Sequence, residues 1–104
     1  MEGSYAFFKA IKVGNLETVQ GFLKRSDKYL FQLDDKGRSP LIVATRYEHL
    51  AIVKYILECG VNVDHEDFSE KKALSFAIQA KNTMLVKILL QKGAEPWSDI
   101  SNNY

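Results

Sequence analysis

The chain has 104 residues and a formal net charge of +1, with 46% hydrophobic and 26% charged residues. This length suits one domain with a modest core, and the hydrophobic content excludes disorder over most of the chain. The balanced charge excludes a nucleic-acid binder, since binding to phosphates needs a clustered basic excess.

An internal repeat runs along the chain with a period of 33 to 34 residues. Ala10, Ala44 and Ala77 set the register, and side chains of one type recur around them in each unit. Because so many positions coincide, we predict three repeated units, at about residues 4–33, 34–66 and 67–97, with 98–104 as a tail or a truncated further hairpin loop. The coinciding positions are Phe7, Leu41 and Leu74; Asn15, His49 and Asn82; Val19, Val53 and Val86; Phe22, Ile56 and Leu89; and Leu23, Leu57 and Leu90.

Each unit is predicted to form two short helices. In the first unit Phe7 and Ala10 mark one helix, and Val19 marks the next. In the second unit Ser39 is a good N-cap, and Pro40 follows at the first helical position, where its missing N–H costs nothing.

The second unit continues with another helix and a turn. Ile52, Val53, Ile56 and Leu57 form a stripe at helical spacing. Gly60 ends that helix, and Gly93 does the same in the third unit. The polar stretch 62–67 suits an exposed hairpin or turn. No such pair of helices buries its own apolar face, so we expect three pairs to stack around one core.

Residues 34–60 carry a recognisable motif. They contain Asp34 and Gly37 in an Asp-x-x-Gly opening, then Pro-Leu at 40–41, the central Ala44, and His49 before the second helix. This segment resembles the ankyrin repeat, residues 67–94 resemble a more diverged copy, and residues 4–26 resemble a first unit. The resemblance implies an all-α solenoid of stacked helix-turn-helix units with protruding hairpin loops, as a single domain over 1–104.

Three departures from the family pattern bear on the fold. Ile42 and Ser75 replace the usual histidine, which puts the hydrogen bonds between units in doubt. The third unit has Glu70 in place of the opening glycine and Lys72-Ala73 in place of Ser-Pro, so its first helix is expected to start differently or to fray. Ile78 stands where the family often has a small residue, as a terminal unit tolerates.

None of the residue types that carry catalysis or bind metals forms a convincing site. His49 is expected to cap a helix or make a structural hydrogen bond, as Asn15 would. His65 lies in an acidic stretch without a second ligand at metal-binding spacing, so a solvated turn is expected. Cys59 has no predicted partner for nucleophilic catalysis and is expected to be a partly exposed thiol. We predict no catalytic, cofactor or metal site.

The start of the chain and its single cysteine suggest a compartment. The lone Cys59 cannot form an intrachain disulfide, and the first residues have no basic start followed by a long apolar run. Apolar runs are broken by Lys54 and Lys87, which makes them too short to cross a bilayer. We expect a cytoplasmic protein, with the nucleus as the alternative, that does not insert into a membrane.

The resemblance implies that partners bind at the hairpin tips and the exposed face of the first helices. Phe68 stands out, because a large apolar side chain at a hairpin tip has little structural reason to be there, whereas Trp97 would cover the end of the core. Tyr47 and the two arginines are residue types that anchor interfaces. The predicted partner-binding residues are Asp35, Lys36, Arg38, Arg46, Tyr47, Glu66, Phe68, Ser69, Lys71 and Gln79.

The sequence therefore predicts a protein–protein interaction module, a non-catalytic adaptor, regulator or scaffold. An enzyme or small-ligand protein would need a pocket with converging titratable groups, which nothing in the sequence marks. Within the binding class, residues 84–90 are too apolar all round for a covered terminal helix. This leaves a permanent subunit of a large assembly, docking through its C-terminal end, or a piece of a longer stack as alternatives.

Overall fold

The computed structural model describes residues 3–96, which form six α-helices and one short 3₁₀ helix, without any strand. The helices are α1 (Ser4–Val13), α2 (Leu16–Arg25), α3 (Pro40–Arg46), α4 (Leu50–Glu58), α5 (Ala73–Gln79) and α6 (Thr83–Gln91), and η1 (Asp27–Phe31) follows α2. The predicted all-α fold is confirmed. Trp97 and the predicted tail 98–104 lie outside the described residues.

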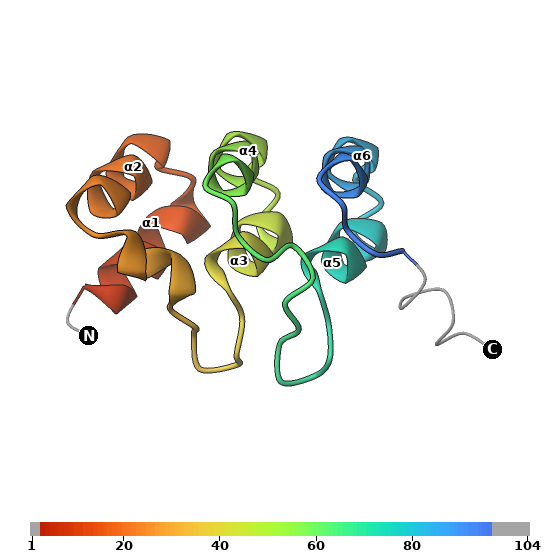
Figure 1. Ribbon diagram of the computed structural model, residues 1–104, viewed down its shortest axis with the longest axis horizontal. Helices are drawn as coiled ribbons and strands as arrows, with labels where there is room; N and C mark the ends of the chain where they lie inside the picture. The colour runs from red at the N-terminus through yellow and green to blue at the C-terminus, as the bar shows by residue number, and fades with distance from the viewer. Residues whose placement is uncertain (1–2, 97–104) are drawn as a thin grey trace.

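The helices pair into three layers placed side by side, α1 with α2, α3 with α4 and α5 with α6 (Figure 1). Each layer is one helix-turn-helix unit, and an extended loop connects it to the next. Both loops project on the same side of the stack, below the inner helices α1, α3 and α5. We call residues 32–39 the first hairpin loop and residues 60–72 the second hairpin loop.

The middle layer is buried most completely. Every residue of α3 from Pro40 to Thr45 is buried, because α3 packs against α1 on one side and α5 on the other. The buried hydroxyl of Thr45 donates to the carbonyl of Leu41 at 2.8 Å. The largest fully buried side chains are Phe7, Ile11, Val19, Leu41, Ile42, Val43, Ile52, Val53, Ile56, Leu74, Leu85 and Leu89.

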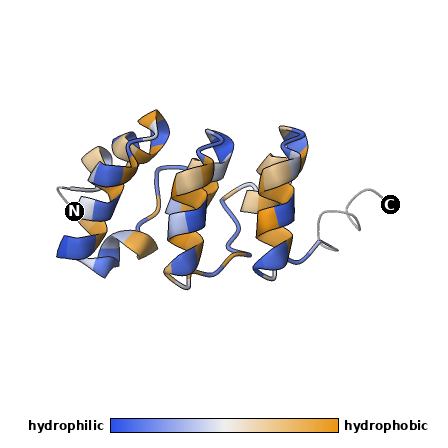
Figure 2. Ribbon diagram, turned by 90° about the horizontal axis from the view of Figure 1, so that it is seen from above, coloured by the Kyte–Doolittle hydropathy of each residue, from blue (hydrophilic) through white to orange (hydrophobic). Residues whose placement is uncertain are grey.

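The two end layers bury their apolar positions less completely. Phe22 and Leu23 are half-buried, and Phe22 packs with Phe7 and Tyr29 in an aromatic cluster with ring centroids 5.1 to 5.7 Å apart. At the other end Leu90 is 41% exposed, although its equivalent Leu57 is only 7% exposed. Seen from above, hydrophobic residues recur along α4 and also along α6 (Figure 2).

Capping residues define the helix ends as expected. The Ser39 hydroxyl accepts a hydrogen bond from the Ile42 N–H, and the Asn15 and Asn82 side chains accept from the third residue of α2 and α6. Gly60 and Gly93 follow the second helices with positive φ of 79° and 92°. These residues satisfy backbone groups that short helices leave unpaired.

The first helix of the third unit starts differently from that of the second unit, which is one of the two expected outcomes, and it does not fray. This helix, α5, has seven residues, as α3 does, and its first residue, Ala73, lies 33 residues after Pro40, the first residue of α3. The Lys72 N–H donates to the Ser75 hydroxyl at 3.0 Å, which partly replaces the missing Ser-Pro start. None of the helices within the described residues has the length and apolar character needed to cross a bilayer.

The burial of Leu57 leads to a prediction about stability. Leu57→Ala should lower the free energy of unfolding by about 2–5 kcal/mol, because it leaves a cavity between layers. Urea unfolding followed by the helical circular dichroism signal measures this. Leu90→Ala removes the equivalent but exposed side chain and should cost less than half as much, so equal losses would contradict the burial difference.

Candidate functional site

Most of the predicted partner-binding residues lie on two kinds of element, the hairpin loops and the C-terminal ends of the inner helices. The first hairpin loop holds Asp35, Lys36 and Arg38, and the second holds Glu66, Phe68, Ser69 and Lys71. Arg46 and Gln79 are the last residues of α3 and α5, and Tyr47 follows Arg46.

Aspartate side chains hold the two hairpin loops in the same shape. In the first loop the Asp34 carboxylate accepts from the N–H groups of Lys36 and Arg38, both at 2.9 Å. In the second loop the Asp67 carboxylate accepts from Ser69 and Lys71 at 2.8 and 2.9 Å. Local side-chain hydrogen bonds of this kind replace the pairing of a longer hairpin. The residues at each tip are therefore held out toward solvent.

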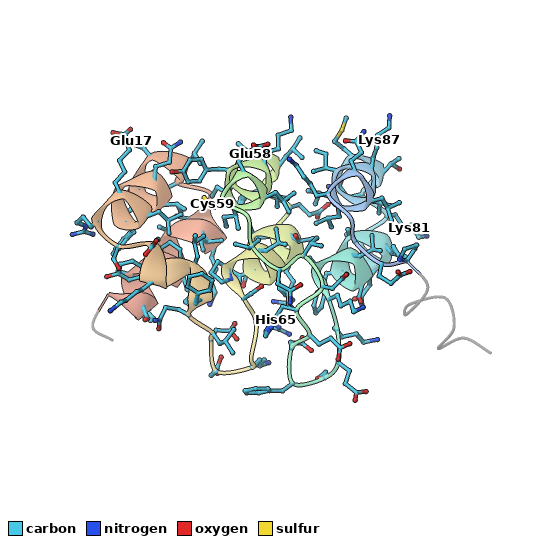
Figure 3. All side chains as sticks on the ribbon, viewed as in Figure 1. Glu17, Glu58, Cys59, His65, Lys81 and Lys87 are labelled. Carbon is cyan, nitrogen blue, oxygen red and sulfur yellow. The ribbon has the colours of Figure 1, made fainter. Side chains whose placement is uncertain are left out.

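The loops are tied to each other, which the missing family histidines had put in doubt. The Phe68 N–H donates to the Lys36 carbonyl at 3.0 Å, and the His65 Nε2 lies 2.9 Å from the Gly37 carbonyl oxygen. Figure 3 shows His65 between the two loops. The prediction that His65 belongs to a solvated turn is therefore wrong, because the residue is half-buried and its ring bridges the two hairpin loops.

Phe68 has a structural contact that the sequence did not indicate. Its ring lies against Gly37, close enough that a Cβ at Gly37 would be 2.4 Å from the Phe68 Cδ1. Gly37 also has φ of +75°, a backbone conformation that favours glycine. The ring nevertheless stays 76% exposed. The expectation that Phe68 has little structural reason for its position is corrected, while its exposed apolar surface remains.

Three hollows adjoin one another along the ends of the inner helices. The first, of about 250 Å³, is lined by Lys12, Asp34, Asp35, Lys36, Arg38, Val43, Arg46 and Tyr47. The second, of about 290 Å³, is lined by Arg46, Phe76, Gln79 and Ala80, and the third by Lys71, Ser75, Ile78 and Gln79. Arg46 is shared by the first two and Gln79 by the last two. We call this row of hollows the groove face.

Aromatic rings support the arginines of the groove face. The Arg46 guanidinium carbon lies 5.3 Å from the centroid of the Phe76 ring and 5.9 Å from that of Tyr47. The Arg38 guanidinium carbon lies 5.5 Å from the same Phe76 centroid. Cations over aromatic faces at such distances are attracted to them. Phe76 thus positions two arginines from the neighbouring layer.

Arg38 is less available than the sequence suggested. Its side chain is only 16% exposed, and its Nε lies 3.6 Å from the buried carboxylate of Asp67. That distance is too long for a hydrogen bond, so the pair is an ion pair between the two loops. Arg38 therefore stabilises the arrangement of the two hairpin loops. The neighbouring Arg46 and Tyr47, by contrast, are exposed.

The structure also indicates which predicted residues stand apart and which contributors were missed. Glu66 and Ser69 are exposed on the second hairpin loop and line none of the three hollows. Lys12 and Phe76 were missed. The repeat register contains the signal for Lys12, because it occupies the position of Arg46 and Gln79 in the preceding unit.

His49 makes a structural hydrogen bond rather than a cap. It occupies the N-cap position of α4, but its side chain forms no capping hydrogen bond. Its Nε2 lies 2.8 Å from the Lys12 carbonyl oxygen, at the end of α1. The structural hydrogen bond expected for His49 is therefore confirmed, and the capping alternative is not observed. His49 joins the first two layers, and His65 joins the two hairpin loops, each through a backbone carbonyl.

Cys59 is exposed, with its thiol 3.4 Å from the Tyr55 carbonyl oxygen. Partial burial and, secondarily, the negative charge of Glu58 raise the pKa of the Cys59 thiol. A raised pKa leaves less thiolate at neutral pH, which makes the sulfur a poorer nucleophile. Within residues 3–96 no group of three or more His, Cys, Asp or Glu side chains could hold a metal ion.

A separate apolar hollow of about 210 Å³ lies between η1 and the first residues of the second hairpin loop. It is lined by Leu30, Phe31, Leu33, Ser39, Pro40, Leu41, Val61, Asn62 and His65. Its polar side chains already serve the fold: Ser39 caps α3, His65 contacts the Gly37 carbonyl, and Asn62 accepts from the Asp64 N–H. This hollow offers packing surface without a set of converging catalytic groups.

The stack of helix pairs with projecting loops defines a helical-repeat solenoid protein. The family model for ankyrin repeats in three copies matches residues 2–100. The chain therefore belongs to the ankyrin-repeat family, as the sequence motif predicted.

The curated relatives are much longer proteins, and each is similar to this chain over a small part of its own length. The sex-determining protein fem-1 of Caenorhabditis elegans is 32% identical over 99 residues, covering 82% of this chain and 15% of the relative. Human rabankyrin-5 is 30% identical over 96 residues, covering 90% of this chain and 8% of the relative. An L-asparaginase of Dirofilaria immitis is 33% identical over 81 residues, which cover 78% of this chain and 14% of that protein. The chain thus spans a small fraction of each of these relatives.

A solved structure shows the same fold. A chain in the complex of a predatory endopeptidase from Bdellovibrio bacteriovorus with an immunity protein matches with a TM-score of 0.80 and 28% identity. The match covers 86% of this chain and 47% of that chain.

The contact between Phe68 and Gly37 can be measured with a matched control. Gly37→Ala and Gly60→Ala both place a side chain at a positive φ, but only the first meets a neighbouring ring. Strain at positive φ costs about 1–2 kcal/mol in both variants. Gly37→Ala should lose more stability than Gly60→Ala, because its Cβ also meets the Phe68 ring. In a Phe68→Ala background the difference should shrink, as measured by urea unfolding. An unchanged difference would place the ring elsewhere.

The raised pKa of Cys59 predicts slow alkylation. Below its own pKa the thiol is mostly protonated, and thiolate appears only as the pH rises through that raised value. Iodoacetamide should therefore modify Cys59 in the folded chain at pH 8 more slowly than it modifies a cysteine in an unstructured peptide. Glu58→Gln should bring the rate closer to that of the peptide. A folded-state rate above that of the peptide would contradict the assignment.

Proposed function

We propose that the chain is a non-catalytic protein–protein interaction module that binds a partner protein through the groove face and the hairpin tips. Such a module would serve as an adaptor, regulator or scaffold. The observation that carries the proposal is the groove face itself, because seven of the ten predicted residues line its three adjoining hollows. Phe68 adds an exposed aromatic ring at the edge of the neighbouring loop.

The shape and residue types of the surface support protein binding. The molecule is elongated, with extents of 43 × 25 × 22 Å, so a groove along its length is large enough for a standard interface of about 800 Å² per partner. Tyrosine, phenylalanine and arginine side chains anchor such interfaces, and Tyr47, Phe68 and Arg46 are all exposed. We infer that the three predicted units, at about residues 4–33, 34–66 and 67–97, each contribute one part of this binding surface.

The absence of enzymatic activity is part of this proposal. Both histidines within the described residues contact backbone carbonyls that hold the stack and its loops together, and the Cys59 thiol has a raised pKa. The match to an L-asparaginase covers only 14% of that protein. We propose the cytoplasm as the compartment, with the nucleus as the alternative, because a single exposed thiol suits a reducing environment.

The last layer supports a second proposal, permanent docking into a larger assembly or a longer stack. Ile78 and Leu90 are equivalent to Thr45 and Leu57, which the next layer buries. In the third layer the same positions are 47% and 41% exposed. Met84 is 52% exposed on the same layer. This apolar end would suit a permanent neighbour better than a transient one.

Substitutions on the groove face should separate function from fold. Once affinity capture and mass spectrometry identify a partner, Tyr47→Ala and Phe68→Ala should each weaken its binding about tenfold or more, as truncated aromatic anchors do. Titration calorimetry with the purified partner measures the loss. Circular dichroism should show that both variants keep the helical signal.

Two sets of controls test the alternatives. Lys54→Ala and Lys87→Ala change exposed residues of the outer helices, and Figure 3 shows Lys87 pointing away from the hairpin loops. These variants should bind as the unmodified chain does. If Ile78→Ser and Leu90→Ser abolish binding while Tyr47→Ala and Phe68→Ala leave it intact, the docking end is the functional surface and the groove proposal is wrong.

A further inference from the structure

We infer that the groove face recognises an extended acidic segment of its partner, with Arg46 pairing with an aspartate or glutamate side chain. This inference rests on the proposed function and adds the chemistry of the partner. It starts from the distribution of charge among the three hollows, which the overall charge of the chain conceals.

The first hollow contains a local excess of basic groups. Lys12, Lys36, Arg38 and Arg46 line it, against the two carboxylates of Asp34 and Asp35. The Asp34 carboxylate already accepts two backbone N–H groups, so it is held within the loop. The positive side chains come from three elements, α1, the first hairpin loop and α3, and therefore converge on one space.

Arg46 differs from Arg38 in its pairing. Arg38 forms an ion pair with Asp67 and is largely buried. Arg46 is exposed, and among residues 3–96 it has no carboxylate within ion-pair distance. Its guanidinium group is held by the rings of Phe76 and Tyr47. A guanidinium group that is held in place but not neutralised can bind a carboxylate, which is also planar, through two parallel hydrogen bonds.

The position of Arg46 favours an extended segment. Arg46 lines both the first hollow and the second, so a chain that crosses from one to the other passes its guanidinium group. The second hollow is bounded by Phe76, Gln79 and Ala80, none of them charged. A fitting segment would therefore place an acidic side chain in the first hollow and an uncharged side chain in the second.

The surrounding charges favour a protein segment over a nucleic acid. Glu66 and Glu70 are exposed on the second hairpin loop beside the groove face, and Asp35 is exposed at the first hollow itself. A continuous polyanion would bring phosphates close to these carboxylates, and like charges in proximity disfavour binding. A peptide with one or two acidic residues presents its charge only where the basic groups lie.

A displayed library of random dodecapeptides, selected against the full chain, tests the inference. We expect the selected peptides to share an acidic residue next to an uncharged one. A synthetic peptide from the consensus should lose about tenfold or more in affinity with the Arg46→Gln variant, and less than about twofold with Lys87→Gln. Replacing the acidic residue of the peptide by its amide should cost as much as Arg46→Gln.

A charge exchange makes the test specific. The Arg46→Glu variant should reject the consensus peptide and bind a version in which lysine replaces the acidic residue. If selected peptides lack acidic residues but lose affinity with Tyr47→Ala, the groove still binds protein and the acidic-partner inference is wrong. If Arg46→Gln does not affect selected acidic peptides, the inference is also wrong. If no selected peptide responds to any groove substitution, the inference and the proposed function fail together.

Discussion

Burial of α3 between α1 and α5 is the interaction on which the other features depend. A helix of seven residues is too short to be stable in water by itself, because few hydrogen bonds offset the cost of starting it. Its residues from Pro40 to Thr45 are nonetheless all buried, and Ala44 allows the neighbouring helices to approach. The apolar area removed from water at both sides of α3 supplies the free energy that the short helix lacks. Each inner helix is thereby aligned with the next.

This alignment also determines where the loops and hollows lie. When α3 and α5 pack side by side, the hairpin loops that precede them are brought into contact, and His65, Phe68 and Arg38 close the space between them. The C-terminal ends of the same helices, together with residues of both hairpin loops, line the groove face. The groove is therefore a consequence of core packing, and Val43 alone among its lining residues belongs to the buried core.

The repeat register was sufficient to predict the helix pairs, the caps at Ser39 and Asn82 and the burial of Leu57. Each of these depends on residues close in sequence or at a fixed offset. The roles of His65 and Phe68 were not predictable in this way. Both depend on a contact with Gly37, 28 and 31 residues earlier, and such contacts follow from packing geometry between units. The position of Phe76 under two arginines was missed for the same reason.

The same register explains why chemistry varies where structure does not. Lys12, Arg46 and Gln79 occupy one position in three successive units, just beyond Ala10, Ala44 and Ala77. The alanines are buried and must stay small, whereas the side chains two residues later are exposed and lie outside the core. The fold therefore fixes a row of positions but leaves their charge open. The change from two cations to an amide along this row gives the groove face a direction, because four basic side chains line the first hollow and Lys71 alone is basic in the third. Under the proposed function this asymmetry favours one orientation of the partner, because the reverse would move its acidic residue from the four basic side chains of the first hollow to Lys71 alone.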